Sequence, residues 1–117
     1  MRKEVYVECW FLIPIRSDTD VGDGKLHSST TWEWLNEQLF TLFEACTMAP
    51  GVYSGFYRDP DTGARVDDES RKFIIAIRRS KLRQLRKLLR QACRVFQQKC
   101  IYLSIAGEVE LIWDSAD

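Results

Sequence analysis

Two residues in this sequence, His27 and Glu8, are candidates for transferring a proton in a catalytic site. His27 is the only histidine, and it lies in a polar loop, residues 17–28 (SDTDVGDGKLHS). Imidazole titrates near neutral pH, so His27 could act as a general base or a ligand if this loop closes over a pocket. Glu8 alternates with Tyr6 and Trp10, and a carboxylate enclosed by such rings could also handle a proton. A loop histidine and a solvated glutamate without catalytic roles are the simpler interpretations.

The sequence matches none of the common metal or phosphate templates. There is no second histidine and no C-x-x-C pair, so we expect no zinc site, no other metal and no cofactor. The segment DVGDGK does not fit the strand-to-helix phosphate motif, and its aspartates would repel phosphate. The sequence has four cysteines and no C-x-x-C pair, so we predict free thiols in a reducing cytoplasm, most of them buried: Cys9, Cys46, Cys93 and Cys100.

Charge is strongly segregated along a chain whose formal net charge is zero. Residues 59–69 (DPDTGARVDDE) contain five acids, whereas no acid occurs between Ser70 and Gly107. The stretch without acids between Ser70 and Gly107 contains many arginines and lysines. It is compatible with a solvated surface, with contact to an acidic protein surface, and with nucleic-acid binding. On a helix, five of its side chains would form one ridge, called here the basic ridge: Arg83, Arg86, Lys87, Arg90 and Arg94.

The N-terminal segment is typical of a strand. Residues 5–15 have apolar side chains at every second position, which is the period of a half-buried strand. Glu4 and Glu8 interrupt the apolar run, so we do not expect a signal peptide. No apolar stretch approaches the length of a membrane span. The side chains predicted to face the core are Val5, Val7, Cys9, Phe11 and Ile13.

Two segments have the spacing of amphipathic helices. The first is predicted to begin at a capping box made by Thr30 and Glu33, and the second at a cap provided by Ser80. Their apolar side chains recur at identical intervals, so each helix would lay one stripe on a flat surface. The stripes are Trp32, Leu35, Leu39, Leu42, Phe43 and Cys46 in the first helix, and Leu82, Leu85, Leu89, Ala92, Cys93 and Phe96 in the second.

Three further strands are predicted over residues 52–58, 71–78 and 101–106. Gly107 is expected to mark a bulge or turn, after which residues 109–113 continue as strand. The resulting order, βαββαβ, resembles the ferredoxin-like superfold. This resemblance implies a four-stranded antiparallel sheet in the order 4-1-3-2 with both helices on one face. We therefore expect a single α+β domain spanning residues 1–117.

The face of this sheet away from the helices is predicted to be apolar. Sheet-to-sheet homodimerisation, a small-molecule site and base stacking would each cover such a face, and an ordinary half-exposed surface is the fourth possibility. Tyr53 and Tyr57 would join it in one of the two registers open to their strand. The proposed binding residues on this face are Tyr6, Trp10, Leu12, Ile74 and Tyr102.

These features favour a cytoplasmic, non-catalytic interaction module or a ligand-binding regulatory module that dimerises through its sheet. Two alternatives stay open. The first is a small enzyme of the dimeric α+β barrel type, with chemistry centred on His27, Glu8 or a tyrosine. The second is nucleic-acid binding along the basic ridge. We expect no membrane partner. A superfold alone does not determine function, so the site has to decide between these alternatives.

Overall fold

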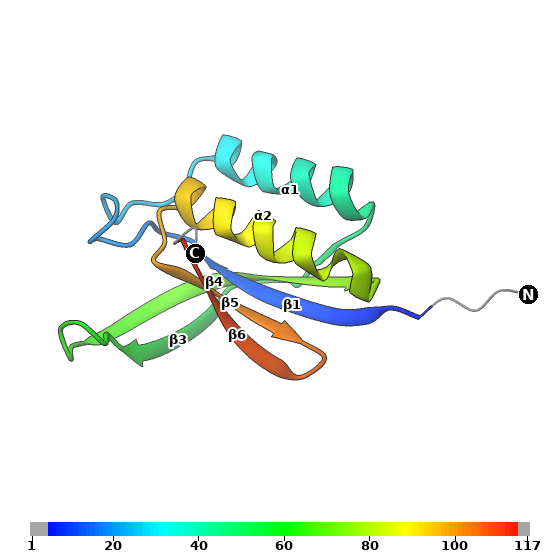
Figure 1. Ribbon diagram of the computed structural model, residues 1–117. Helices are drawn as coiled ribbons and strands as arrows, with labels where there is room; N and C mark the ends of the chain where they lie inside the picture. Colours follow the sequence, from blue (N-terminus) through cyan, green and yellow to red (C-terminus); the bar gives the residue numbers. More distant parts are fainter. Residues whose placement is uncertain (1–4, 115–117) are drawn as a thin grey trace, which may run out of the picture.

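The computed structural model describes residues 5–114, in which two helices cover one face of a six-stranded antiparallel sheet (Figure 1). The helices are α1 (Ser29–Phe43) and α2 (Leu82–Val95), and a short 3-10 turn, Arg79–Lys81, precedes α2. The strands are β1 (Val7–Pro14), β2 (Thr47–Met48), β3 (Tyr53–Arg58), β4 (Arg65–Ile77), β5 (Cys100–Ile105) and β6 (Glu108–Trp113).

The sheet has the order β2-β4-β1-β5-β6, and β3 pairs with the first half of β4. The α+β class is confirmed, but the predicted four-stranded sheet in the order 4-1-3-2 is wrong. The main cause lies at Ala106 and Gly107, which both have positive φ, of 50° and 87°. Two such residues form a tight hairpin turn, so residues 108–113 fold back beside β5 instead of prolonging it.

The core lies between the helices and the sheet. Alternate side chains of β1 are fully or almost fully buried there, as their spacing predicts, except that Val5 is 71% exposed and lies before the strand. Phe11 of β1 stacks on Phe73 of β4, with ring centroids 5.2 Å apart. Burial of these rings and of the leucines from both helices is the main stabilising contribution to the fold.

Both helices begin differently from the sequence prediction. The cap of α1 is Ser28, whose hydroxyl accepts a hydrogen bond from the Thr31 backbone N–H, and the predicted capping box at Thr30 is not the helix start. Ser80 lies within the 3-10 turn, and α2 begins without a side-chain cap. Because α1 ends at Phe43, Cys46 lies beyond the helix and is exposed, contrary to the prediction.

Two hairpins extend away from the helix layer in diverging directions (Figure 1). One is formed by β5 and β6, and the other by β3 and the first half of β4. All six residues of β3 are exposed. The acidic segment 67–69, which the sequence suggests is a loop, is part of β4. Together the hairpins border the face of the sheet opposite the helices, which we call the open face.

Candidate functional site

Apolar and aromatic side chains gather on the open face. Side chains at register partners lie on the same side of a sheet. The register therefore places Trp10 beside Ile74, and Leu12 beside Tyr102. Trp10 also stacks on Tyr102, with ring centroids 5.2 Å apart and planes inclined by 23°. Four of the five proposed binding residues are thus brought together, and the fifth, Tyr6, lies just before β1.

Much of this face is accessible to solvent. Six of its large side chains are between 42% and 50% exposed, which exceeds the scattered single exposures of an ordinary surface. They come from the segment before β1, from β3 and from β6, so they rim the Trp10–Tyr102 pair on several sides. They are Tyr6, Tyr53, Tyr57, Val109, Leu111 and Trp113.

A cation already lies against the rings of this face. The Lys72 ammonium lies 4.3 Å from the ring centre of Trp10 and 5.5 Å from that of Tyr53. A positive charge over an aromatic face is attracted by the negative potential of the ring. The open face therefore offers stacking surfaces, and the Trp10 and Tyr53 rings already attract the positive charge of Lys72.

The most unusual polar group of the open face is the carboxylate of Asp68 in β4. Within residues 5–114 this carboxylate makes no hydrogen bond and no ion pair, although the residue is only partly exposed. Burial raises the pKa of Asp68, and the neighbouring Asp67 raises it further. The Asp67 carboxylate lies on the other face of the strand, 3.0 Å from Arg65. An unpaired, partly desolvated carboxylate of this kind is attractive to a cation.

The strand beside Asp68 places a glycine next to its carboxylate. Its register partner is Gly55, where a Cβ atom would lie 3.4 Å from the Asp68 Oδ1, so the glycine keeps this approach open. Tyr53 and Tyr57 are two positions either side of Gly55 and therefore share its face. Burial raises the pKa of the Tyr57 hydroxyl, and negative charge at Asp18 and Asp68 adds to this effect. A carboxylate between two tyrosines can bind a positively charged group that carries an apolar body.

His27 lies on the other side of the sheet. Its Nε2 is 2.9 Å from the Pro14 carbonyl oxygen, and its ring packs edge-on against Phe96 and Trp32. Burial lowers the pKa of this imidazole, which is therefore kept neutral inside the helix layer. The structure thus separates His27 from the open face by the full thickness of the sheet.

This arrangement predicts a pH dependence of stability. The folded His27 has a pKa below the ordinary value of roughly 6.5, so the unfolded chain binds a proton that the folded chain resists. We expect the free energy of unfolding to decrease as the pH falls from about 7.5 to about 5.5. His27→Gln keeps an N–H donor for Pro14 and should flatten this slope in urea denaturation. An equal slope in His27→Gln and in the unaltered protein would contradict His27 as the source of this pH dependence.

Glu8 lies on the open face but is not enclosed. Its register partner is Ala76, its side chain is exposed, and only its backbone carbonyl is bonded, to the Ala106 N–H. The structure therefore does not bring Glu8 and His27 together, and neither sits beside Asp68.

In the described range no cluster of three or more metal-binding side chains occurs. Across residues 5–114, no helix is long and apolar enough to cross a membrane.

The basic ridge lies on the helix layer, along β6. The Arg86 guanidinium makes two hydrogen bonds to the Glu110 carboxylate, of 3.0 Å and 2.7 Å, and Arg94 pairs with Asp114 at 2.7 Å. The side chains of Arg83, Lys87 and Arg90 make no hydrogen bond or ion pair with any other described residue. Part of the ridge is thus neutralised by β6, a contact that depends on the hairpin turn at Gly107. Nucleic-acid binding along it remains a prediction.

No protein-family model and no curated protein matches the sequence. Two solved structures match the fold over 97% of this chain. One is a phage SAM lyase in complex with S-methyl-5′-thioadenosine, with a TM-score of 0.68, 13% sequence identity and 95% of that chain covered. The other is a phage SAM lyase in the apo state, with a TM-score of 0.64, 15% identity and 94% of that chain covered.

Both matched structures are enzymes, which overturns the prediction of a non-catalytic interaction or regulatory module. The comparison favours the alternative of a small α+β enzyme instead. Neither residue that the sequence suggested lies in an enclosed site, since His27 is half-buried against Phe96 and Glu8 is exposed. The residues that the sequence prediction missed are Gly55 and Asp68. A signal for Asp68 does exist, because Val66, Asp68, Ser70 and Lys72 continue the alternation of β4.

Proposed function

We propose that this protein is a lyase that acts on S-adenosylmethionine and releases S-methyl-5′-thioadenosine, with the substrate bound on the open face. The fold likeness to the phage SAM lyases suggests the reaction class. The observation that carries the proposal for this chain is the unpaired Asp68 carboxylate between Tyr53 and Tyr57. A sequence identity of 13–15% transfers no residue roles, so these are argued from geometry and chemistry.

The chemistry of the substrate fits the groups on the open face. S-adenosylmethionine has two positive charges, a sulfonium and an ammonium, and an adenine ring. Adenine can stack on the Trp10–Tyr102 pair. The Asp68 carboxylate can pair with a positive charge of the substrate, and the tyrosine rings beside it can contribute further attraction. Lys72 can pair with the carboxylate of the methionine part.

In the reaction, the bond breaks between the sulfur and the carbon chain derived from methionine. The electron pair stays on sulfur, which becomes the neutral thioether of S-methyl-5′-thioadenosine. The four-carbon fragment completes its valences by closing on its own carboxylate or by losing a proton. The protein has to hold the charged substrate in one geometry and keep water from the breaking bond.

Incubation of the purified protein with S-adenosylmethionine tests this proposal. We expect S-methyl-5′-thioadenosine to appear by liquid chromatography at a rate proportional to protein concentration. A sample without protein gives the spontaneous background, and NMR of the mixture identifies the four-carbon product. Release no faster than background by a protein with a cooperative thermal transition would reject the function.

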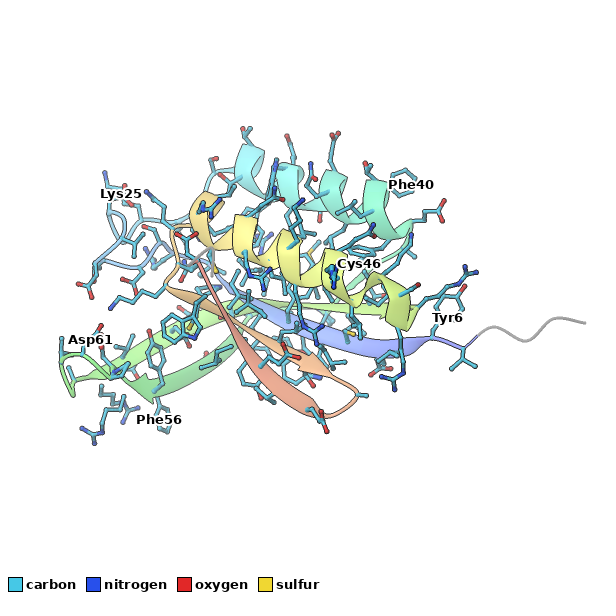
Figure 2. All side chains as sticks on the ribbon, in the orientation of Figure 1. Tyr6, Lys25, Phe40, Cys46, Phe56 and Asp61 are labelled. Carbon is cyan, nitrogen blue, oxygen red and sulfur yellow. The ribbon has the colours of Figure 1, made fainter. Side chains whose placement is uncertain are left out.

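Trp10→Leu should weaken the binding of S-methyl-5′-thioadenosine by about tenfold or more. The substitution removes a ring that can stack on adenine, and base–aromatic stacking contributes about 1–3 kcal/mol per base. Isothermal titration calorimetry measures the change in Kd. Phe40→Leu is the matched control, because Phe40 is 71% exposed on α1 and projects away from the sheet (Figure 2). Equal Kd values for Trp10→Leu and the unaltered protein would argue against stacking at this position.

We also propose that the protein forms a homodimer and is cytoplasmic. The open face keeps six large apolar or aromatic side chains partly exposed, which supports a homodimer formed through the sheet. Light scattering at micromolar concentration tests the assembly. The four free cysteines support a reducing, cytoplasmic location.

A further inference from the structure

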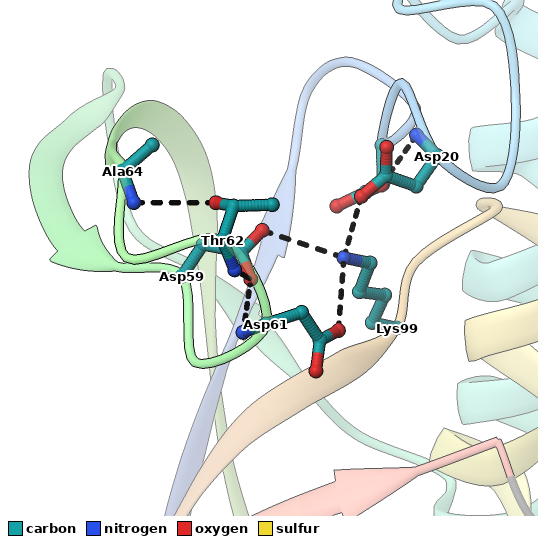
Figure 3. A network of polar contacts seen from close by, with 7 residues as sticks. Asp20, Asp59, Asp61, Thr62, Ala64 and Lys99 are labelled. Carbon is teal, nitrogen blue, oxygen red and sulfur yellow. Dashed lines mark hydrogen bonds and ion pairs between the residues drawn. The ribbon is translucent and has the colours of Figure 1, made fainter.

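One lysine, Lys99, links the turn of the hairpin that carries Asp68 to two other segments of the chain (Figure 3). The Lys99 ammonium, just before β5, lies 2.6 Å from Asp20, 3.5 Å from Asp59 and 3.8 Å from Asp61. Asp20 belongs to the loop of residues 17–28, whereas Asp59 and Asp61 form the turn between β3 and β4. Lys99 therefore joins three segments that are far apart in the sequence.

Backbone N–H groups hold one of the carboxylates beside Lys99 and order the loop that carries another. Asp59 is a buried residue, 8% exposed, and its carboxylate accepts hydrogen bonds from the backbone N–H groups of Asp61 and Thr62. On the loop side, the Asp20 N–H donates to the Asp18 carboxylate. The hydrogen bond to Asp20 raises the pKa of Lys99, and the N–H of Asp61 lowers the pKa of Asp59. Both groups therefore stay charged at neutral pH.

The β3–β4 hairpin has few other contacts that could fix its direction. β3 pairs only with β4, and none of its residues is buried. A two-stranded ribbon is only marginally stable by itself in water. Without the lysine, the three carboxylates would also repel one another.

We propose that Lys99 is a positioning residue, a clamp that holds the β3–β4 hairpin at the angle that places Asp68 and Tyr57 on the open face. The clamp itself concerns only the mobility of the hairpin, whereas its effect on turnover rests on the proposed function. Asp68 and Tyr57 are on the two strands that the clamped turn connects. Movement of that turn therefore changes their distance from Trp10 and Lys72.

Hydrogen exchange measures the clamp directly. In the full-length protein, Lys99→Met should increase amide exchange in residues 53–70 by about tenfold or more, with unchanged exchange in α2. Lys87→Met is the matched control, because Lys87 lies on α2 without an ion pair to any described residue. Asp20→Asn removes the shortest contact and keeps the lysine, so it should act in the same direction. Unchanged exchange of the hairpin in both Lys99→Met and Asp20→Asn would overturn the clamp.

Kinetics test the positioning. Lys99→Met should lower kcat/KM for S-adenosylmethionine about tenfold, mainly through KM, whereas Lys99→Arg keeps the charge and should restore most of it. A loosened hairpin with unchanged kcat/KM would overturn the positioning role. The two failures are distinguishable: if the unaltered protein shows no turnover, the proposed function is rejected, and the exchange result still decides the clamp.

Discussion

Asp68→Asn should lower kcat/KM for S-adenosylmethionine about 30- to 5,000-fold. Leaving a charge without its partner in a desolvated contact costs about 2–5 kcal/mol, which corresponds to a change of this size. Binding of S-methyl-5′-thioadenosine should be nearly unchanged, because this product has lost both positive charges of the substrate. The expected result is therefore a selective loss of substrate recognition, measured by initial rates and by calorimetric titration with the product.

The same substitution should leave thermal stability unchanged or raise it. The folded Asp68 has a raised pKa because burial disfavours its charged form. At neutral pH the ionised carboxylate therefore opposes folding, and this cost disappears as the pH falls through the folded pKa. Asparagine has the same shape without the charge. A residue that reduces stability where it stands is typical of a functional site.

Asp67→Asn is the matched control for this experiment. Asp67 is the adjacent residue of the same strand, but it is exposed and pairs with Arg65 on the opposite face. Surface ion pairs of this type contribute about 1 kcal/mol or less, so we expect little change in rate or stability. If Asp67→Asn and Asp68→Asn lowered kcat/KM to the same extent, a general electrostatic effect would explain the loss, and a specific role of Asp68 would be rejected.

Phe96→Ala should lower the free energy of unfolding by about 3–5 kcal/mol. Phe96 has no solvent exposure, and its ring centre lies 4.9 Å from those of both His27 and Trp32. Removing it leaves a cavity beneath α1 and the loop before it. Urea denaturation measures the loss. Val95 is one residue away and 40% exposed, so Val95→Ala should lower the free energy of unfolding much less. Similar costs at both positions would contradict this description of the core.

The alternation of apolar residues was sufficient to predict which side of β1 faces the helices. Val7, Cys9, Phe11 and Ile13 are buried, and Tyr6, Glu8, Trp10 and Leu12 lie on the other side, because side-chain direction along a strand depends only on its period of two. The helices were predictable for the same reason, since their stripes have the period of an α-helix. The α+β class follows from this local information.

The candidate site was predictable only in part. Trp10 and Tyr102 follow from alternation. Asp68 also continues the alternation of β4, but it lies in an acidic run after a DPDTG turn, which is typical of a loop. Its inclusion in β4 depends on pairing with β3, a tertiary contact that the local sequence does not specify. The position of β6 likewise depends on the backbone conformation of Ala106 and Gly107. The Asp20–Lys99 contact joins distant segments and has no local signal.

The basic ridge also bears on how the protein avoids aggregation. β6 is an edge strand with half-exposed Val109, Leu111 and Trp113 on one face, the kind of edge on which another chain can pair and a fibril can grow. Along this edge lie Arg83, Lys87 and Arg90, which have no described counterion. Two such edges approaching each other would bring like charges together before any backbone hydrogen bond forms. Positive charge beside the edge of β6 therefore disfavours its pairing with a second copy, as gatekeeper residues do.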